Sequence, residues 1–131
     1  MARPISIQPT EVELQILRIL WASGGAIARE IHNGLAEIEA KETTYSTTVK
    51  MLSVMLEKGL VKRDESTSPH CYRATVSQKI TQRKMLSQLI ERVYDGSAHS
   101  LVLQALSAGK ASPEEIAEVR RILDELEGNT P

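Results

Sequence analysis

Small hydroxyl side chains and one lysine gather on one side of a predicted helix over about residues 43–58. Since an α-helix has 3.6 residues per turn, Ser46 and Lys50 fall on the same side, with Thr47 close by. Hydroxyl and ammonium groups can hydrogen-bond to base edges or phosphates, and a threonine methyl group can contact that of thymine. The pattern therefore favours a helix that enters the major groove of DNA. The alternative for each residue alone is that it caps the helix or lies in solvent.

Basic residues flank this helix in the sequence, where their side chains could hold a nucleic-acid backbone. They are Lys41 before the helix and Lys62, Arg63 and Arg73 after it. Apolar side chains mark the opposite side of the helix, which we expect to be buried. They are Tyr45, Val49, Leu52 and Leu56. The two sides together predict a helix that rests on a core and presents its other side to a polyanion.

The net charge of −1 conceals an asymmetry between the two parts of the chain. Residues 1–84 contain 12 Lys and Arg against 9 Asp and Glu, whereas residues 85–131 contain 4 against 8. A basic first part and an acidic second part suggest that a polyanion binds the first part alone. The alternative is that these charges are simply scattered over solvated surfaces.

Length and composition exclude several classes of protein. With 131 residues, 41% of them hydrophobic and 25% charged, the chain is typical of a globular protein rather than a disordered or membrane-spanning one. The first ten residues have no apolar export signal and the chain has one cysteine, so we expect a cytoplasmic protein. The spacing of Cys71 and the three histidines matches no metal-binding or catalytic motif. We therefore expect no enzyme and no cofactor, and leave open a metal or redox site that His70 and Cys71 share with a second chain.

Two further helices and a hairpin must position the hydroxyl-rich helix. The first helix is predicted to begin with a capping box at Thr10 and to end at Gly24-Gly25. The second is predicted over about residues 28–36. Two strands follow the third helix, over residues 60–63 and 71–76. Three helices followed by a two-stranded hairpin is the order of a winged helix, so we predict a mostly α fold with a small β-hairpin.

The remainder of the chain predicts three short amphipathic helices, separated by glycines at 96 and 109. Their apolar positions are Leu86, Leu89, Ile90 and Val93, then Leu101 and Val102, then Ile116, Val119, Leu123 and Leu126. Three such helices cannot enclose a core alone. We therefore predict a winged-helix domain over residues 1–76 and a helical dimerisation region over residues 77–131, with packing onto the first domain as the alternative.

Several stretches together carry a family resemblance. They are PTEVEL and ILRILW over residues 9–21, REI at 29–31, YSTTVK through LEKGLVKR over 45–63, and RVYDGS at 92–97. In order and spacing they resemble the BlaI/MecI/CopY family of bacterial penicillinase-repressor-like transcriptional regulators, over almost the whole chain. The resemblance implies a homodimeric winged-helix repressor that binds an inverted-repeat DNA operator through the third helix and the β-hairpin, which is the wing of such a fold. The family's contacts on that helix map to Thr44, Ser46, Thr47 and Lys50.

The sequence also departs from this family in the second part of the chain. The β-lactam-responsive members are inactivated by proteolysis after a signal from a membrane sensor-protease, usually at an Asn–Phe pair. The matching position here is Gln104-Ala105. The copper-responsive members have a C-terminal cysteine cluster that this chain lacks. A winged helix that binds another protein and has no affinity for DNA is the alternative function, and the overall net charge is its best support.

Overall fold

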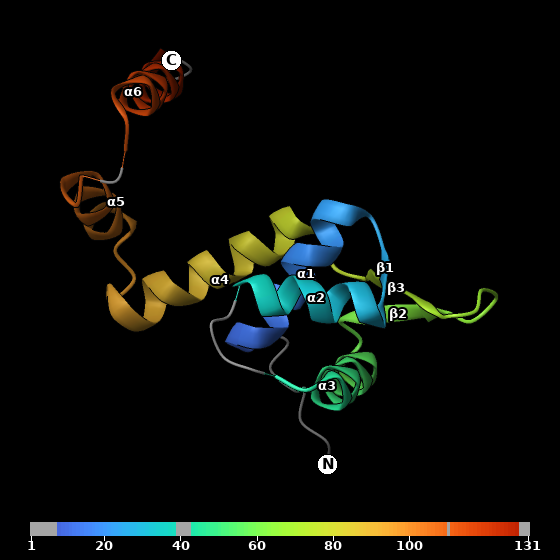
Figure 1. Ribbon diagram of the computed structural model, residues 1–131. Helices are drawn as coiled ribbons and strands as arrows, with labels where there is room; N and C mark the ends of the chain where they lie inside the picture. Colours follow the sequence, from blue (N-terminus) through green and yellow to red (C-terminus); the bar gives the residue numbers. More distant parts are fainter. Residues whose placement is uncertain (1–7, 39–42, 110, 129–131) are drawn as a thin grey trace. The chain divides into compact units, whose positions relative to one another are not determined.

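The structure is a computed structural model that describes residues 8–38, 43–109 and 111–128 (Figure 1). The chain divides into two compact units, Met1–Met85 and Leu86–Pro131. This division falls inside a helix, α4, which spans Gln78–Val93. Compactness alone does not test the functional boundary expected at residue 76, which stays a prediction.

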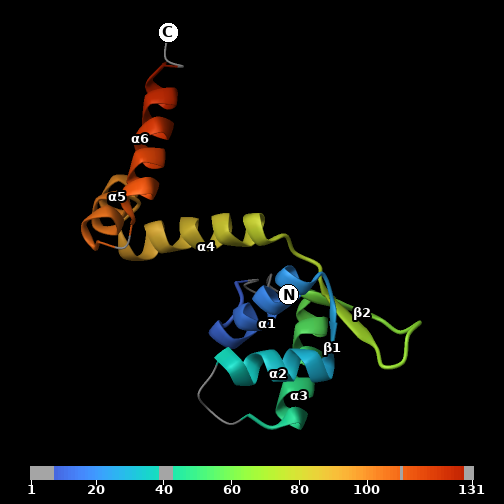
Figure 2. The same ribbon diagram turned by 45° about the horizontal axis from the view of Figure 1, so that its top comes forward.

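Before α4, the described residues of the first unit form three helices and three strands. They are α1 Glu11–Ser23, β1 Ala26–Ile27, α2 Ala28–Ile38, α3 Tyr45–Lys58, β2 Val61–Asp64 and β3 Cys71–Ala74. In the two views of Figures 1 and 2, α2 lies beside α3 and the loop between β2 and β3 extends away from the helices. We call residues 61–74 the wing. This arrangement confirms the predicted winged helix.

The sheet has three strands rather than the two predicted from the sequence. Its order is β1-β3-β2, and β1 pairs antiparallel with β3 through Ala26 opposite Tyr72 and Ile27 opposite Cys71. A strand of two residues is too short to show an alternating pattern, so the sequence could not reveal it. The predicted strand limits were also wrong: β2 starts one residue later than expected, at Val61, and β3 ends at Ala74.

The ends of the helices follow from local hydrogen bonds. The predicted capping box is present, because the Glu13 N–H donates to Thr10 Oγ1 (3.2 Å) and the Thr10 N–H donates to Glu13 Oε1 (3.0 Å). Gly59 ends α3 with φ 78°, a left-handed conformation that favours glycine. The start of α2 has no Ser, Thr or Asp cap, and there the Ile27 N–H donates to Glu30 Oε1 (3.0 Å).

The core of the first unit joins all three helices to the sheet. Its buried apolar side chains are Ile16, Leu17, Leu20, Ala26, Ile31, Leu35, Leu52, Met55, Leu60, Val61 and Tyr72. A polar link extends this packing, since Trp21 Nε1 donates to the Val76 carbonyl at 2.9 Å, after the end of β3. The core therefore fixes α3 against both α2 and the wing.

The second unit is built differently. It contains the end of α4, then α5 Ala98–Ser107 and α6 Pro113–Gly128, as the sequence predicts in outline. Neither α5 nor α6 has a buried residue. Leu123, for example, is 53% exposed. Within the part of the chain that the structure describes, no helix is both long and apolar enough to cross a membrane.

Candidate nucleic-acid interface

The exposed side of α3 carries the hydroxyl and lysine side chains that the sequence predicts. Thr44, Ser46, Thr47 and Lys50 are all exposed. Thr44 is the N-cap of the helix, and its Oγ1 accepts a hydrogen bond from the Thr47 N–H at 3.2 Å. The same oxygen lies 3.1 Å from Ser46 Oγ and 2.8 Å from Thr47 Oγ1. The three hydroxyls thus form one cluster that keeps free donor and acceptor capacity for a ligand.

The buried side of α3 differs from the prediction. The helix buries Thr48, Leu52 and Met55, while Tyr45 and Val49 are 37% and 38% exposed. The prediction was therefore wrong for Tyr45 and Val49, although it was right for Leu52. The reason is Thr48, whose Oγ1 lies 2.8 Å from His32 Nδ1 on α2. A polar side chain with such a partner can be buried at little cost, which a count of apolar positions does not detect.

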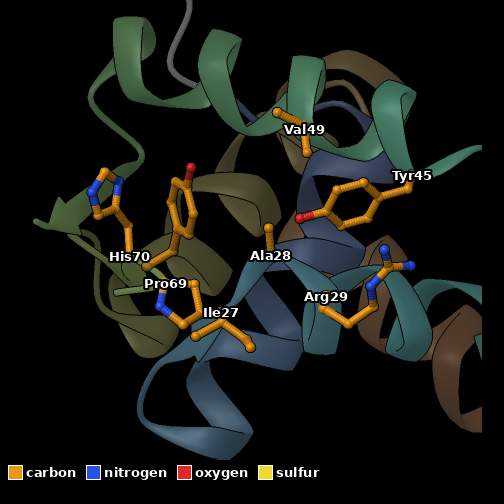
Figure 3. A pocket seen from close by; sticks show the side chains of 8 residues that line it. Ile27, Ala28, Arg29, Tyr45, Val49, Pro69 and His70 are labelled. Atoms are coloured by element: carbon orange, nitrogen blue, oxygen red, sulfur yellow. The ribbon is translucent and has the colours of Figure 1, made fainter. Parts of the chain in front are cut away.

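Tyr45 and Val49 instead line a surface pocket of about 330 Å3. Its other lining residues are Ile27, Ala28, Arg29, Pro69, His70 and Tyr72. Figure 3 shows Arg29 beside the Tyr45 ring on one side of the pocket, and Pro69 and His70 on the other. The Arg29 guanidinium carbon lies 3.9 Å from the centre of the Tyr45 ring, the geometry of a cation–π contact.

The Tyr45 ring makes a second contact with α2, through His32. His32 meets it edge-on, with ring centres 5.8 Å apart and an angle of 88° between the planes. A continuous set of contacts therefore connects Arg29, Tyr45, His32 and Thr48 across α2 and α3. No role for Arg29 is predicted from the sequence, because no spacing within either helix indicates this contact between them.

The basic residues of the wing leave the sheet on different faces. Directly opposite residues of an antiparallel pair share a face, and the register pairs Arg63 with Tyr72 and Lys62 with Arg73. Tyr72 is buried, so Arg63 lies on the face turned toward the core and Arg73 on the other face. Together with Lys62 and Asp64, these two arginines line a hollow of about 230 Å3.

Arg63 already has an acidic partner. Its Nη2 and Nε donate to Glu65 Oε2 at 2.6 Å and 3.0 Å. The hydrogen bond to Glu65, and a second to Tyr72, raise the pKa of the Arg63 guanidinium, and the same pair lowers the pKa of the Glu65 carboxyl. A DNA phosphate would have to compete with Glu65 for Arg63. Lys41, also predicted from the sequence, lies outside the residues that the structure describes.

The remaining predicted positions lie in the second unit. The expected dimerisation stripes are at most half-buried, and Gln104 and Ala105 are exposed within α5. The position that matches the family's cleavage pair is therefore helical, and its cleavage stays a hypothesis raised by the resemblance alone. In the described ranges no group of three or more His, Cys, Asp or Glu side chains could hold a metal ion.

A sequence model of the penicillinase repressor family matches residues 9–125. The chain belongs to this family. It is 28% identical over 116 residues to the methicillin resistance regulatory protein MecI of Staphylococcus aureus (strain N315), covering 88% of this chain and 92% of MecI. It is 24% identical over 121 residues to a penicillinase repressor of S. aureus, covering 92% and 94% of the two chains. A penicillinase repressor of Bacillus licheniformis is 25% identical over 120 residues, covering 90% and 91%.

Family membership confirms the resemblance inferred from the sequence. The family is one of repressors, so the chain is a transcriptional regulator and, at the level of the family, not an enzyme.

Proposed function

We propose that this chain is a homodimeric repressor that binds an inverted-repeat DNA operator, with α3 of each protomer in the major groove. The observation that carries the proposal is the exposed hydroxyl and lysine side of α3 on a winged helix of the penicillinase repressor family. The core holds α3 by its opposite side, through Leu52 and Met55, so base contacts would not require the helix to unfold. Rigid presentation of this kind favours base recognition.

Each polar residue of α3 has a distinct role in this proposal. Ser46 and Thr47 contact base edges through their hydroxyls, and Lys50 donates to a base acceptor or a phosphate. Thr44 caps the helix by accepting from the Thr47 N–H, and the other N–H groups of the first turn donate to the phosphate backbone. On the wing, Arg63 and Arg73 contact phosphates, as does Lys41 before the helix.

The exposed apolar stripes support a homodimer. Large apolar side chains lie in solvent along α4, α5 and α6 of a single chain, among them Leu86, Val102 and Leu123. Exposed apolar surface of this kind is typical of protein interfaces, and a second copy supplies a matching surface by symmetry. A dimer would also hold two α3 helices at a fixed separation, which an inverted repeat requires.

The first test is selection of bound sequences from random duplex DNA by the full-length chain, with its oligomeric state measured by sedimentation in the same buffer. We expect enrichment of an inverted repeat whose half-sites are about 10 base pairs apart, or a multiple of this spacing. A folded protein with no enriched sequence and no salt-dependent DNA binding would refute the proposal. It would favour a winged helix that binds another protein.

Lys50→Ala tests the proposed DNA interface at a single residue. We expect it to weaken operator binding by about 1–3 kcal/mol per protomer if Lys50 contacts a base, as measured by a shift of the binding isotherm. Lys84→Ala is the matched control, since it removes the same charge from an exposed position on α4. Equal affinities of the two variants would remove Lys50 from the interface.

A further inference from the structure

The pocket beside α3 is formed by three elements that meet there. Ile27, Ala28 and Arg29 come from the junction of β1 and α2, Tyr45 and Val49 from the first two turns of α3, and Pro69, His70 and Tyr72 from the wing (Figure 3). The pocket therefore lies next to the exposed side of α3, which we propose contacts DNA.

We propose that this pocket binds the sugar–phosphate backbone of one operator strand and that Arg29 binds a phosphate there. The proposal rests on the proposed function. When a helix enters the major groove, the elements next to it lie over the backbone that borders the groove, and the first helix of a helix-turn-helix crosses that backbone. Here the start of α2 and the wing border α3 at the pocket, where the backbone would pass.

Arg29 is suited to this role because it is oriented and, among the residues that the structure describes, has no acidic partner. Its stacking on Tyr45 holds the guanidinium at the pocket while its N–H groups stay available. The neighbouring carboxylate of Glu30 accepts from the Ile27 N–H instead. Among the ion pairs that the structure describes, Lys58, Arg63 and Arg121 have acidic partners and Arg29 does not take part.

The apolar walls of the pocket fit the sugar part of the same ligand. Ile27, Ala28, Val49 and Pro69 offer apolar surface to a deoxyribose, and His70 lies across the pocket from Arg29. This occupant also gives a reason for the exposure of Tyr45 and Val49. Both side chains would be covered when the backbone binds, whereas in the free protein both remain more than one-third exposed.

Arg29→Ala tests the proposal on the full-length protein. Affinity for the selected operator and for an unrelated duplex is measured between about 50 and 300 mM salt. Because a phosphate contact carries no sequence information, we expect the variant to bind both duplexes more weakly by the same factor, on the order of tenfold at the lowest salt. The slope of log affinity against log salt should fall by about 1 for each protomer, hence about 2 for the dimer.

Two variants of Tyr45 test whether its ring positions Arg29. Tyr45→Phe keeps the aromatic face and should retain the wild-type salt slope. Tyr45→Leu removes the face and should reproduce part of the Arg29→Ala effect, with thermal unfolding reporting that the fold is intact. Arg18→Ala is the control for charge, since Arg18 is exposed on α1.

Three outcomes would overturn the proposal. Arg29→Ala could bind both duplexes with the wild-type affinity and slope, which would place Arg29 outside the interface. It could lose affinity for the operator alone, which would mean a base contact. If the wild-type protein binds no duplex at all, the proposed function itself fails. A wild-type protein that binds DNA while Arg29→Ala changes nothing refutes only the pocket.

Discussion

The two units of the chain place similar apolar side chains in opposite environments. In the first unit, apolar residues of α1, α2, α3 and the sheet form a shared core, with Ile16 and Leu52 fully buried. In the second, α5 and α6 have amphipathic patterns yet no buried residue. The first unit thus has the buried core of an independent domain, whereas α5 and α6 leave their apolar side chains at the surface.

The same contrast is present in the charged groups. Glu13 is buried at the start of α1 and lies 2.8 Å from the Lys58 ammonium at the end of α3, so this ion pair joins two helices distant in sequence. In α6, Arg121 lies 3.4 Å from Glu118 within a single exposed turn. Exposed pairs of that kind contribute little to stability. The Glu13–Lys58 pair, like the core of the first unit, therefore joins residues distant in sequence, although the wing of the same unit also has a local pair, Arg63–Glu65.

The largest expected effect comes from deleting a core side chain in the first unit. Leu52→Ala leaves a cavity at a position that is 0% exposed, and should lower the free energy of unfolding by about 2–5 kcal/mol. The measurement is denaturant unfolding followed by fluorescence of Trp21, the single tryptophan. Leu123→Ala, the same substitution on α6, should leave this transition almost unchanged. Equal losses in the two variants would contradict the contrast between the units.

A charge placed on α6 tests the proposed dimer interface directly. Leu123→Glu puts a carboxylate in the proposed dimer interface, so we expect the dimer dissociation constant to rise at least tenfold, or about 1.4 kcal/mol, as measured by sedimentation. Operator affinity should fall with it, because two linked α3 helices bind more tightly than one. Ala117→Glu adds the same charge at an exposed α6 position outside the stripe. A Leu123→Glu protein that sediments only as a dimer would rule out this interface.

The sequence predicts those parts of the fold that depend on local signals. Thr10 and Glu13 mark a capping box within four residues, and Gly59 marks the end of α3, so the helices could be placed closely. β1 could not be predicted, because two residues become a strand only through their pairing with β3. Local patterns thus define elements, whereas pairing between distant residues defines the sheet.

The same limit applies to the candidate site. Ser46 and Lys50 could be placed on the exposed side of α3 from helical spacing alone. Tyr45 could not, since its exposure depends on the burial of Thr48 against His32 of another helix. The contact between Arg29 and Tyr45 likewise joins two helices. Residues that act through contacts between helices therefore require the structure.

The smallest expected effect is the change with pH in the stabilisation that Glu13 contributes to the fold. Burial alone would raise the pKa of the Glu13 carboxyl, but hydrogen bonds from Lys58 and Thr10 and the charge of Lys58 together lower the pKa below its ordinary value of 4.5. A carboxyl with a lowered pKa in the folded state stabilises the fold above its unfolded pKa, and this contribution disappears as the pH falls through the folded pKa. Glu13→Gln should therefore cost about 1–2 kcal/mol at pH 7.

The difference in unfolding free energy between Glu13→Gln and the wild type should then narrow as the pH falls below about 4.5, because the wild-type carboxyl also becomes neutral. Denaturant unfolding at a series of pH values measures it. Glu11→Gln, in the same helical turn but exposed, is the matched control. A cost that stays constant from pH 7 to pH 3 would mean that Glu13 acts through its shape rather than its charge. The ion pair would then no longer distinguish the first unit from the exposed Arg121–Glu118 pair of the second.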